Sequence, residues 1–296
     1  MMKSPVAIAL IVMTALLSLP LSAAQKDTLK IEACAPGIFR VRISPSGEFP
    51  QSLMERYGIL KTDWETPAVK EHKDADTWTL STSTHTLKVD IKAQTISLMD
   101  AAGKEIISGI SFQGPGSTLS QVLRDSIQVQ YGGMITRRNG GIIGDDDGSL
   151  SEMDKTEGGD PFKSCVLRIP IKGHERFYGG GSTSRAHIQH RGERLRMWAT
   201  YQHTEIPMPF MMSSDGWGIY SNSTRKSYFD VGRLEKDALS IYTTYPESDF
   251  YLMAADDMPG VLNAYTLLTG RNYLLPKWAY GFCFGPNMQM DQWDIL

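Results

Sequence analysis

The stretch DTWTLSTSTHTLKVDI, residues 76–91, and the following TISLMDAAGKEIIS, residues 95–108, decide the fold class. In both, apolar or β-branched residues alternate with polar ones, which is the period of a half-buried strand. The segment DAAGKE, residues 100–105, interrupts the second stretch with turn-forming residues. The pattern predicts antiparallel strands joined by short turns.

The same pattern continues on both sides of this stretch. Upstream, LKIEACAPGIFRVRIS, residues 29–44, alternates about a Pro36-Gly37 turn, which is typical of a hairpin. No long segment before Ala255 has an apolar period of 3.6 residues. We therefore expect a mainly β domain, an antiparallel sandwich or barrel. Further strands are predicted at IQVQY (127–131), CVLRIPI (165–171), WGIYSNS (217–223), KSYFDVG (226–232), LSIYTTY (239–245) and DFYLMAA (249–255).

The pattern changes after Ala255. The segment DDMPGVLNAYTLLTG, residues 256–270, predicts a helix, because Pro259 suits its start, Gly270 its end, and apolar residues recur at helical spacing. The almost wholly apolar WAYGFCFG, residues 278–285, is typical of a strand buried on both faces. The pattern indicates the start of a β/α unit, and we expect the natural sequence to continue beyond Leu296.

Composition and the N-terminus bear on location and partners. The 296 residues carry a formal net charge of -3, so no global positive field favours nucleic acid. Residues 1–24 combine Lys3, an apolar run and Pro20, which predicts a secretory signal peptide, with a membrane anchor as the alternative. No other segment approaches the length of a membrane span. We expect export to the periplasm or the cell exterior.

Glycine, histidine and arginine gather between residues 175 and 198. The phrase ERFYGGGS, residues 175–182, matches neither GxGxxG nor GxxxxGK[ST], so we expect a tight backbone passage beside another segment or a ligand. His187 and His190 are three apart, but no carboxylate or cysteine completes a metal pattern around them. The nearby arginines are expected along a solvated face or paired with Glu193. They are Arg185, Arg191, Arg194 and Arg196.

Other polar motifs are weaker. Asp145 to Asp147 are contiguous, whereas a calcium loop needs alternating acids, so a surface loop is expected there. The three cysteines form no CxxC pair, and buried free thiols are the expected state. Asn222-Ser223-Thr224 is a glycosylation sequon if the host glycosylates. We expect no metal and no cofactor.

Four phrases in order resemble the N-terminal half of glycoside hydrolase family 31. They are ERFYGGGS (175–182), RGERLRMW (191–198), IPMPFMMSSDGWGIYSNSTRKSYFDVG (206–232) and DFYLMAADDMPGVLNAYTLLTGRNYLLPKWAYGFCFG (249–285). The resemblance implies a galactose-mutarotase-like β-sandwich over residues 25–255 and a helical link over 256–276. It implies the start of a (β/α)8 catalytic barrel over 277–296, with its first strand at 278–284.

The resemblance also implies the chemistry. Family members hydrolyse α-glycosidic bonds with retention, using two aspartates on later barrel strands in phrases such as W-x-D-M-N-E. No such phrase occurs here, so no catalytic residue is assigned. A sandwich loop of the family contacts the sugar through W-N-x-D, where this chain has Trp198 and, in place of the aspartate, Tyr201. The substrate-binding residues implied are Trp198, Tyr201, Gln202 and Phe284.

These observations favour the N-terminal part of an exported retaining α-glycosidase, with a carbohydrate as its substrate. A non-catalytic carbohydrate-binding or scaffold sandwich is the alternative. Mutarotase activity, which would need a histidine and a carboxylate such as His203 and Glu205, is a third. The sequence indicates no oligomeric state.

Overall fold

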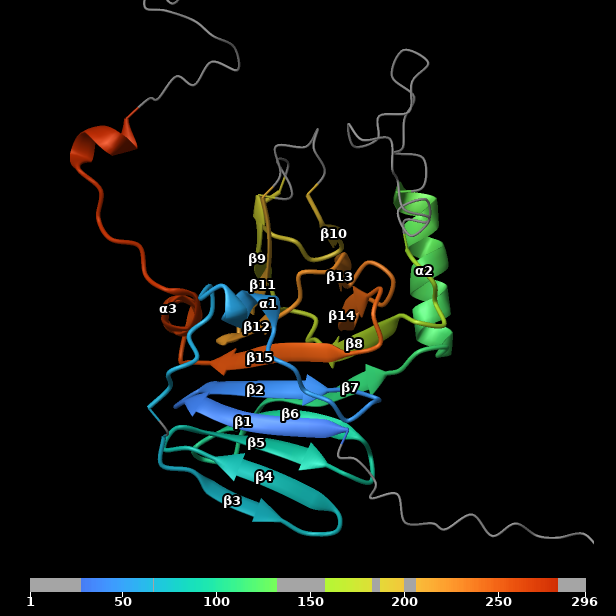
Figure 1. Ribbon diagram of the computed structural model, residues 1–296, viewed down its shortest axis with the longest axis horizontal. Coiled ribbons are helices and arrows are strands. Elements are labelled where there is room, and N and C mark those ends of the chain that lie inside the picture. Colours follow the sequence, from blue (N-terminus) through green and yellow to red (C-terminus); the bar gives the residue numbers. More distant parts are fainter. Residues whose placement is uncertain (1–27, 66, 132–157, 183–186, 200–205, 282–296) are drawn as a thin grey trace, which may run out of the picture.

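The computed structural model describes residues 28–65, 67–131, 158–182, 187–199 and 206–281. Two antiparallel sheets pack face to face, and a helix covers part of the outer face of each (Figure 1). The described chain is therefore a four-layer α/β/β/α sandwich, and the prediction of a mainly β antiparallel fold is confirmed.

The first sheet has six strands and the second has nine. In spatial order the six are β1 (Leu29–Ala35), β2 (Ile38–Ile43), β15 (Ser248–Ala254), β12 (Trp217–Ser221), β11 (Ile206–Ser213) and β9 (Phe177–Ser182). The nine are β10 (Arg194–Met197), β13 (Ser227–Val231), β14 (Ala238–Thr243), β8 (Cys165–Pro170), β7 (Glu105–Gln113), β6 (Thr95–Asp100), β5 (His85–Asp90), β4 (Thr77–Ser81) and β3 (Lys70–Lys73).

The predicted hairpins form, and their apolar residues face the core as the alternation predicts. Strand β4 pairs with β5 so that Leu80 lies opposite Leu87, and β5 pairs with β6 so that Leu87 lies opposite Leu98. All three leucines are buried in the core between the sheets. Each such burial contributes about 1.5–3 kcal/mol. The Pro36-Gly37 turn joins β1 to β2, and Gly37 takes the positive φ of 77° that this turn requires.

A helix, α2 (Thr118–Tyr131), replaces the strand predicted at residues 127–131, and that prediction is wrong. Leu123 and Ile127, four residues apart, are fully buried against the outer face of the nine-stranded sheet, whereas Val129 is 89% exposed. A strand would bury Ile127 and Val129 on one face, but a helix separates them. The apolar stripe of α2 is one residue wide, which made its period hard to recognise.

The helix predicted after Ala255 is confirmed as α3 (Met258–Thr269). The Asp257 side chain caps it by accepting from Gly260 N at 2.8 Å, and Gly270, at φ 93°, follows its last residue. Val261 and Leu268 are buried against the outer face of the six-stranded sheet. The short helix α1 (Leu53–Arg56) lies beside the same face and begins with a capping box.

Residues 278–280, expected to begin the first barrel strand, lie instead in a 3-10 turn, η1 (Lys277–Tyr280). No strand in the described part of the chain pairs with this segment, so its backbone makes local bonds, such as Gly281 N to Trp278 O at 3.1 Å. Trp278 is 78% exposed. Residues 282–284 lie outside the described residues. Among the described helices, none has the length and apolar character needed to cross a membrane.

Candidate functional site

The glycines of β9 lie against the backbone of β11. Gly181 has φ 74°, and a Cβ atom there would stand 2.6 Å from Met208 N and would also collide with the Ile206 carbonyl oxygen. Gly179, at φ 126°, approaches the Phe210 backbone in the same way. The expectation of a tight passage beside another segment is confirmed, and the segment is β11.

Trp198 lies at one end of the sandwich, directly after β10. Met197 pairs with Ser227, and this places Trp198 beside Lys226, whose Nζ is 5.8 Å from the centre of the indole ring. The ring is partly exposed at 36%. Strands β9, β10 and β11 reach this end together, at the top of Figure 1. The other predicted sugar contacts, Tyr201, Gln202 and Phe284, lie outside the described residues, as do His203 and Glu205.

The arginine and histidine side chains near Trp198 have structural partners. Arg194 is 4% exposed, and its Nε donates to Asp230 Oδ2 at 2.8 Å, so this arginine is paired with Asp230 and does not lie along a solvated face. Glu193 instead contacts His190 Nδ1 at 3.0 Å, and His190 Nε2 lies 3.1 Å from the Gly179 carbonyl. No cluster of His, Cys, Asp or Glu in the described residues is arranged to hold a metal ion.

Two of the three cysteines are described, and both are buried free thiols, as expected. Burial raises the pKa of Cys34 and of Cys165 to about 12. Because the thiolate is the reactive form, neither thiol is suited to nucleophilic catalysis near neutral pH. Cys283 lies outside the described residues.

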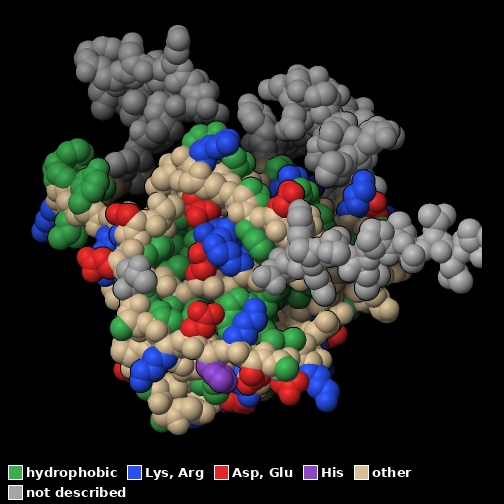
Figure 2. Space-filling model, turned by 60° about the horizontal axis from the view of Figure 1, so that its bottom comes forward, with side chains coloured by type: hydrophobic (Ala, Val, Ile, Leu, Met, Phe, Trp, Pro, Cys, Tyr) green, Lys and Arg blue, Asp and Glu red, His purple; other side chains and the backbone are tan. Residues whose placement is uncertain are grey.

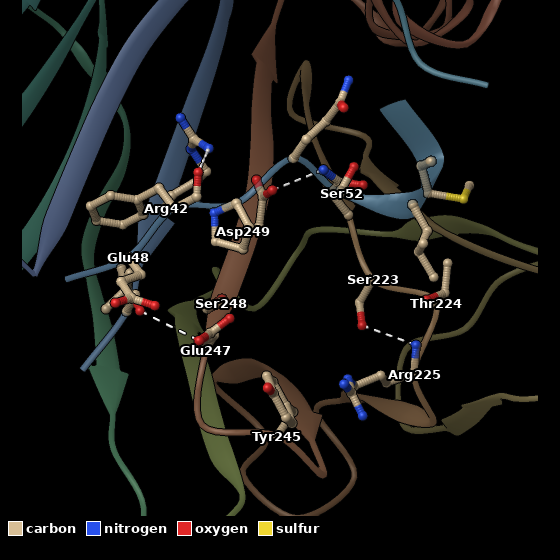
Figure 3. Close-up of a pocket in the computed structure, with 18 residues that line it drawn as sticks. Arg42, Glu48, Ser52, Ser223, Thr224, Arg225, Tyr245, Glu247, Ser248 and Asp249 are labelled. Atoms are coloured by element: carbon tan, nitrogen blue, oxygen red, sulfur yellow. Dashed lines mark hydrogen bonds between the residues drawn. The ribbon is translucent and has the colours of Figure 1, made fainter. Parts of the chain in front are cut away.

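A cavity of about 250 Å³, here called the Asn222 cavity, is lined in part by residues 222–225. Figure 3 shows Ser223, Thr224 and Arg225 on one wall, facing Glu247, Ser248 and Asp249 on the other, with Tyr245 at the lower end. Its lining comes from three separate stretches of chain: Arg42, Ile43, Ser44, Glu48, Phe49, Pro50, Gln51, Ser52, Leu53 and Met54; Asn222, Ser223, Thr224 and Arg225; and Tyr245, Glu247, Ser248 and Asp249.

A buried ionic network holds the walls of the Asn222 cavity. Arg40 donates two hydrogen bonds to Glu55, at 2.8 and 2.9 Å, and two to Asp249, at 3.0 and 2.7 Å. Asn222 Nδ2 donates to Asp249 Oδ2 at 2.8 Å, and the Asn222 backbone N donates to the Asp249 carbonyl at 2.8 Å. A pair of hydrogen bonds between a guanidinium and a carboxylate fixes both side chains in position. Strands β2 and β15, helix α1 and the segment after β12 are thereby joined.

The network sets the ionisation of its members. Burial raises the pKa of Glu55, but hydrogen bonds from Arg40 and from the Ser52 backbone outweigh it and hold that pKa at about 2. Burial of Asp249 raises the pKa of its carboxyl, against the opposing effect of Arg40 and Asn222. Burial alone would lower the pKa of Arg40. The hydrogen bonds to its two carboxylate partners have the larger, opposite effect, so the pKa of Arg40 is raised overall and the side chain keeps its charge.

Two buried side-chain atoms in the described residues lack a hydrogen-bond partner, and both belong to residues that line the Asn222 cavity. They are Arg42 Nε and Asn222 Oδ1. Asn222 is only 5% exposed, and its Nδ2 is engaged by Asp249, so the predicted sequon is inaccessible to a glycan in the folded chain. Sequence reasoning missed this cavity, because Arg40 and Asp249 are 209 residues apart.

Charged side chains elsewhere do not concentrate by sign on the face shown in Figure 2. Lysine and arginine are interspersed with aspartate and glutamate around the apolar groups on that face. A mixed surface of this kind does not present a continuous positive track to nucleic acid.

Comparison with known proteins places this fold in a family. Residues 28–230 match the model of the glycosyl hydrolase 31 N-terminal galactose mutarotase-like domain. The chain belongs to glycoside hydrolase family 31. The resemblance noted from the ordered phrases is confirmed, and the described sandwich is the galactose-mutarotase-like domain of this family.

The curated relatives are much longer than this chain, which spans 22% or less of those described here. The isomaltosyltransferase of Sporosarcina globispora is 26% identical over 288 residues, which is 94% of this chain and 22% of the relative. An α-glucosidase of Saccharolobus solfataricus is 38% identical over 84 residues, covering 27% of this chain and 12% of the relative. An α-xylosidase of the same organism is 31% identical over 107 residues, covering 35% and 14%.

Solved family 31 structures share the fold. The Flavobacterium johnsoniae dextranase complexed with isomaltotriose gives a TM-score of 0.58 at 19% identity, over 86% of this chain and 27% of that one. An α-xylosidase from a soil metagenome, complexed with xylose, gives 0.59 at 19% identity, over 86% and 34%. These likenesses concern the sandwich fold.

Proposed function

We propose that this chain is the N-terminal part of an exported retaining α-glycosidase that hydrolyses α-linked glycosides or oligosaccharides. The observation that carries the proposal is the match of residues 28–230 to the family's N-terminal domain. The names of the relatives, α-glucosidase and α-xylosidase, support an α-linked substrate. The two catalytic carboxylates belong to later barrel strands, and the present chain supplies the sandwich beside them.

Trp198 is the described residue that supports a role in substrate binding. Its partly exposed ring stands at the end of the sandwich where residues 200–205 follow, and an aromatic ring offers a flat apolar face to sugar C–H groups. Tyr201 and Gln202, within those residues, and Phe284 are proposed to contribute further contacts. Tyr201 has one phenol where the family has an acceptor-only carboxylate, which changes the hydroxyl pattern that the pocket recognises.

Hydrolysis assays test the assignment of catalysis. The purified chain is expected to release no nitrophenol from nitrophenyl α-glucoside or α-xyloside, because it lacks both carboxylates. The same chain extended by the reading frame downstream of Leu296, expected to encode a W-x-D-M-N-E phrase, is expected to be active. Turnover by the present chain alone would overturn the proposal. Sugar binding without any downstream barrel frame would favour the non-catalytic alternative.

Kinetics of the extended enzyme test the role of Trp198. Trp198→Ala is expected to raise KM about tenfold, because loss of one stacking contact corresponds to roughly 1–2 kcal/mol. Phe162→Ala is the control, since Phe162 is an aromatic residue that is 67% exposed and lies near Gly116, just before α2. Equal changes in KM for the two variants would show that Trp198 does not contact the substrate.

Export is tested by fractionation. Residues 1–24 carry the features of a cleavable signal, so the mature protein is expected outside the cytoplasm with an N-terminus near Gln25. N-terminal sequencing of protein from each fraction measures this. An uncleaved chain in the cytoplasm would contradict the proposal.

A further inference from the structure

We propose that residues 187–193, here called the strap, are held across the edges of the two sheets by a doubly protonated His190, and that the strap loosens when His190 loses one of these protons. The inference does not depend on the proposed glycosidase activity. The strap leads directly into β10, so whatever holds it also affects the end of the sandwich where Trp198 lies.

The backbone of the strap connects one sheet to the other. On one side, His190 N donates to Phe177 O at 2.9 Å, at the outer edge of β9, which is the last strand of the six-stranded sheet. On the other side, Gly192 N donates to Val231 O at 2.6 Å, in β13 of the nine-stranded sheet. Between the two, Glu193 N donates to His190 O at 3.0 Å and closes a turn. His190 is therefore the residue that attaches the strap to β9.

The ring of His190 is buried between two hydrogen-bond acceptors. The residue is 3% exposed. Its Nδ1 lies 3.0 Å from Glu193 Oε2, and its Nε2 lies 3.1 Å from the Gly179 carbonyl oxygen. A carboxylate and a carbonyl group can only accept, so each ring nitrogen has to donate. Neutral imidazole has one N–H and imidazolium has two, so the geometry fits the imidazolium form.

The groups around the ring allow it to be charged. A buried cation needs a partner of opposite charge, and Glu193 supplies it from the strap itself. His187 approaches the other oxygen of Glu193, with its Nε2 3.9 Å from Oε1, and its side chain is largely exposed. Strand β9 offers the ring a backbone carbonyl group. The two arginines of this stretch bind elsewhere, Arg191 to three backbone carbonyl groups and Arg194 to Asp230.

Loss of one ring proton weakens the attachment of the strap. With a single N–H, His190 can donate to Gly179 or to Glu193 but not to both, and the other nitrogen then turns a lone pair towards an acceptor oxygen. The contacts are therefore complete at low pH, and one of them is lost as the pH rises. Histidine changes its charge between about pH 5 and pH 8, so the order of the strap is expected to respond to pH in that range.

NMR on the purified chain with isotope-labelled histidine tests the proposal, because the shifts of the ring nitrogens distinguish protonated from unprotonated atoms. The signals of His190 are identified by their loss in His190→Gln. Both ring nitrogens are expected to be protonated at pH 5.5, and only one at pH 8.5. Over the same change, the protection factor of the His190 amide in hydrogen exchange is expected to fall about tenfold, as a hydrogen bond is lost. That of Leu252, buried in β15, is expected to stay constant.

Glu193→Gln separates the charge of the ring from the shape of the strap. A glutamine side chain can donate as well as accept, so its amide can donate to an unprotonated Nδ1 while Nε2 still donates to the Gly179 carbonyl. The protection factor of the His190 amide is therefore expected to be the same at pH 5.5 and pH 8.5 in this variant. Glu105→Gln, at an exposed position of β7, is the matched control and is expected to keep the tenfold change. Melting curves establish that each variant folds.

The outcomes decide between a charged and a neutral ring. Two protonated nitrogens at pH 5.5, with protection that falls in the unaltered protein and stays level in Glu193→Gln, support the proposal. One protonated and one unprotonated nitrogen at pH 5.5 would place the proton on Glu193 or leave one contact unmade, and would overturn it. Protection that is independent of pH in the unaltered protein, or that falls equally in Glu193→Gln, also overturns it, because the strap would then be held without the charge of the ring.

Discussion

At the scale of single residues, Arg40 determines the geometry of the cavity walls. It is 7% exposed and carries four hydrogen bonds to two carboxylates that come from α1 and β15. The sequence shows Arg40 and Arg42 only as polar positions of an alternating strand. Nothing local distinguishes a solvated arginine from one that a helix and a distant acid enclose, because that difference arises from tertiary packing. Trp198, by contrast, was singled out by a family phrase, and its contact with sugar stays a prediction.

Replacement of Arg40 measures the strength of the network. Arg40→Met is expected to lower the free energy of unfolding by about 3 kcal/mol, because Asp249 and Glu55 lose the cation that compensates their burial. Arg233→Met, at an exposed position, is the control and is expected to change it by no more than about 0.5 kcal/mol. Urea denaturation gives both values. A loss below about 1 kcal/mol would mean that water stabilises the Asp249 and Glu55 carboxylates nearly as well as Arg40 does.

Acid titration tests the ionisation of Glu55. Its pKa in the folded chain, about 2, lies below its ordinary value of 4.5, so ionised Glu55 stabilises the fold above that value, and this stability is lost as the pH falls towards 2. Glu55→Gln is therefore expected to melt at a lower temperature than the unaltered protein at pH 6. The difference should shrink as the pH falls from about 5 to 2.

Glu65→Gln is the control for this titration, because Glu65 is exposed. It is expected to show no such pH-dependent difference in melting temperature. A gap between Glu55→Gln and the unaltered protein that stays constant from pH 6 to pH 2 would contradict the assignment.

At the scale of elements, sequence periodicity predicted the strands that alternate strictly between buried and exposed residues. It failed for a helix that buries a single row of apolar residues. The hairpins β4–β5 and β6–β7 follow from strict alternation, and α3 follows from its cap, its proline and its terminal glycine. Helix α2 was missed because its fully buried apolar residues, Leu123 and Ile127, form a single row, while Val129 points to solvent. A short polar helix on a sheet depends on tertiary packing more than on its own pattern.

Strand β9 offers a test of backbone contact between elements. Gly181→Ala is expected to destabilise the fold by roughly 2–4 kcal/mol, because the new Cβ combines a positive φ with collision against β11. Gly103→Ala is the matched control: its φ of 82° is similar, but nothing lies within 4 Å of the new atom, so only the conformational cost of about 1 kcal/mol remains. Equal losses in thermal denaturation would show that β9 moves away from β11 freely.

At the scale of the whole molecule, the four layers end with α3. Beyond it the large apolar side chains are exposed: Tyr273 at 83%, Leu274 at 93%, Trp278 at 78% and Tyr280 at 63%. Clustered exposure of this kind is typical of surfaces that contact another domain or chain. The sequence predicted a buried strand here, since it records how apolar a segment is and not what covers it.

Truncation tests where the folding unit ends. A chain that stops after Gly270 is expected to keep its melting temperature within about 2 °C, because residues 271–281 bury almost nothing. A chain that stops after Ala255 also loses α3, exposes Phe210 and Tyr220, and is expected to melt at least about 10 °C lower. Calorimetry on the two truncated chains compares them directly. A large loss in the first would mean that the segment after α3 contributes to the core.

The burial of Asn222 affects how the protein can be produced. A eukaryotic secretory host attaches glycans to Asn-Ser-Thr while the chain is still unfolded, and a glycan at this asparagine would have to fit where only 5% of the residue is open to solvent. The modified fraction would be retained as misfolded protein, and the yield would fall. Thr224→Val removes the acceptor signal at an exposed position and leaves the Asn222 amide with Asp249. A bacterial host avoids the competition between glycosylation and folding altogether.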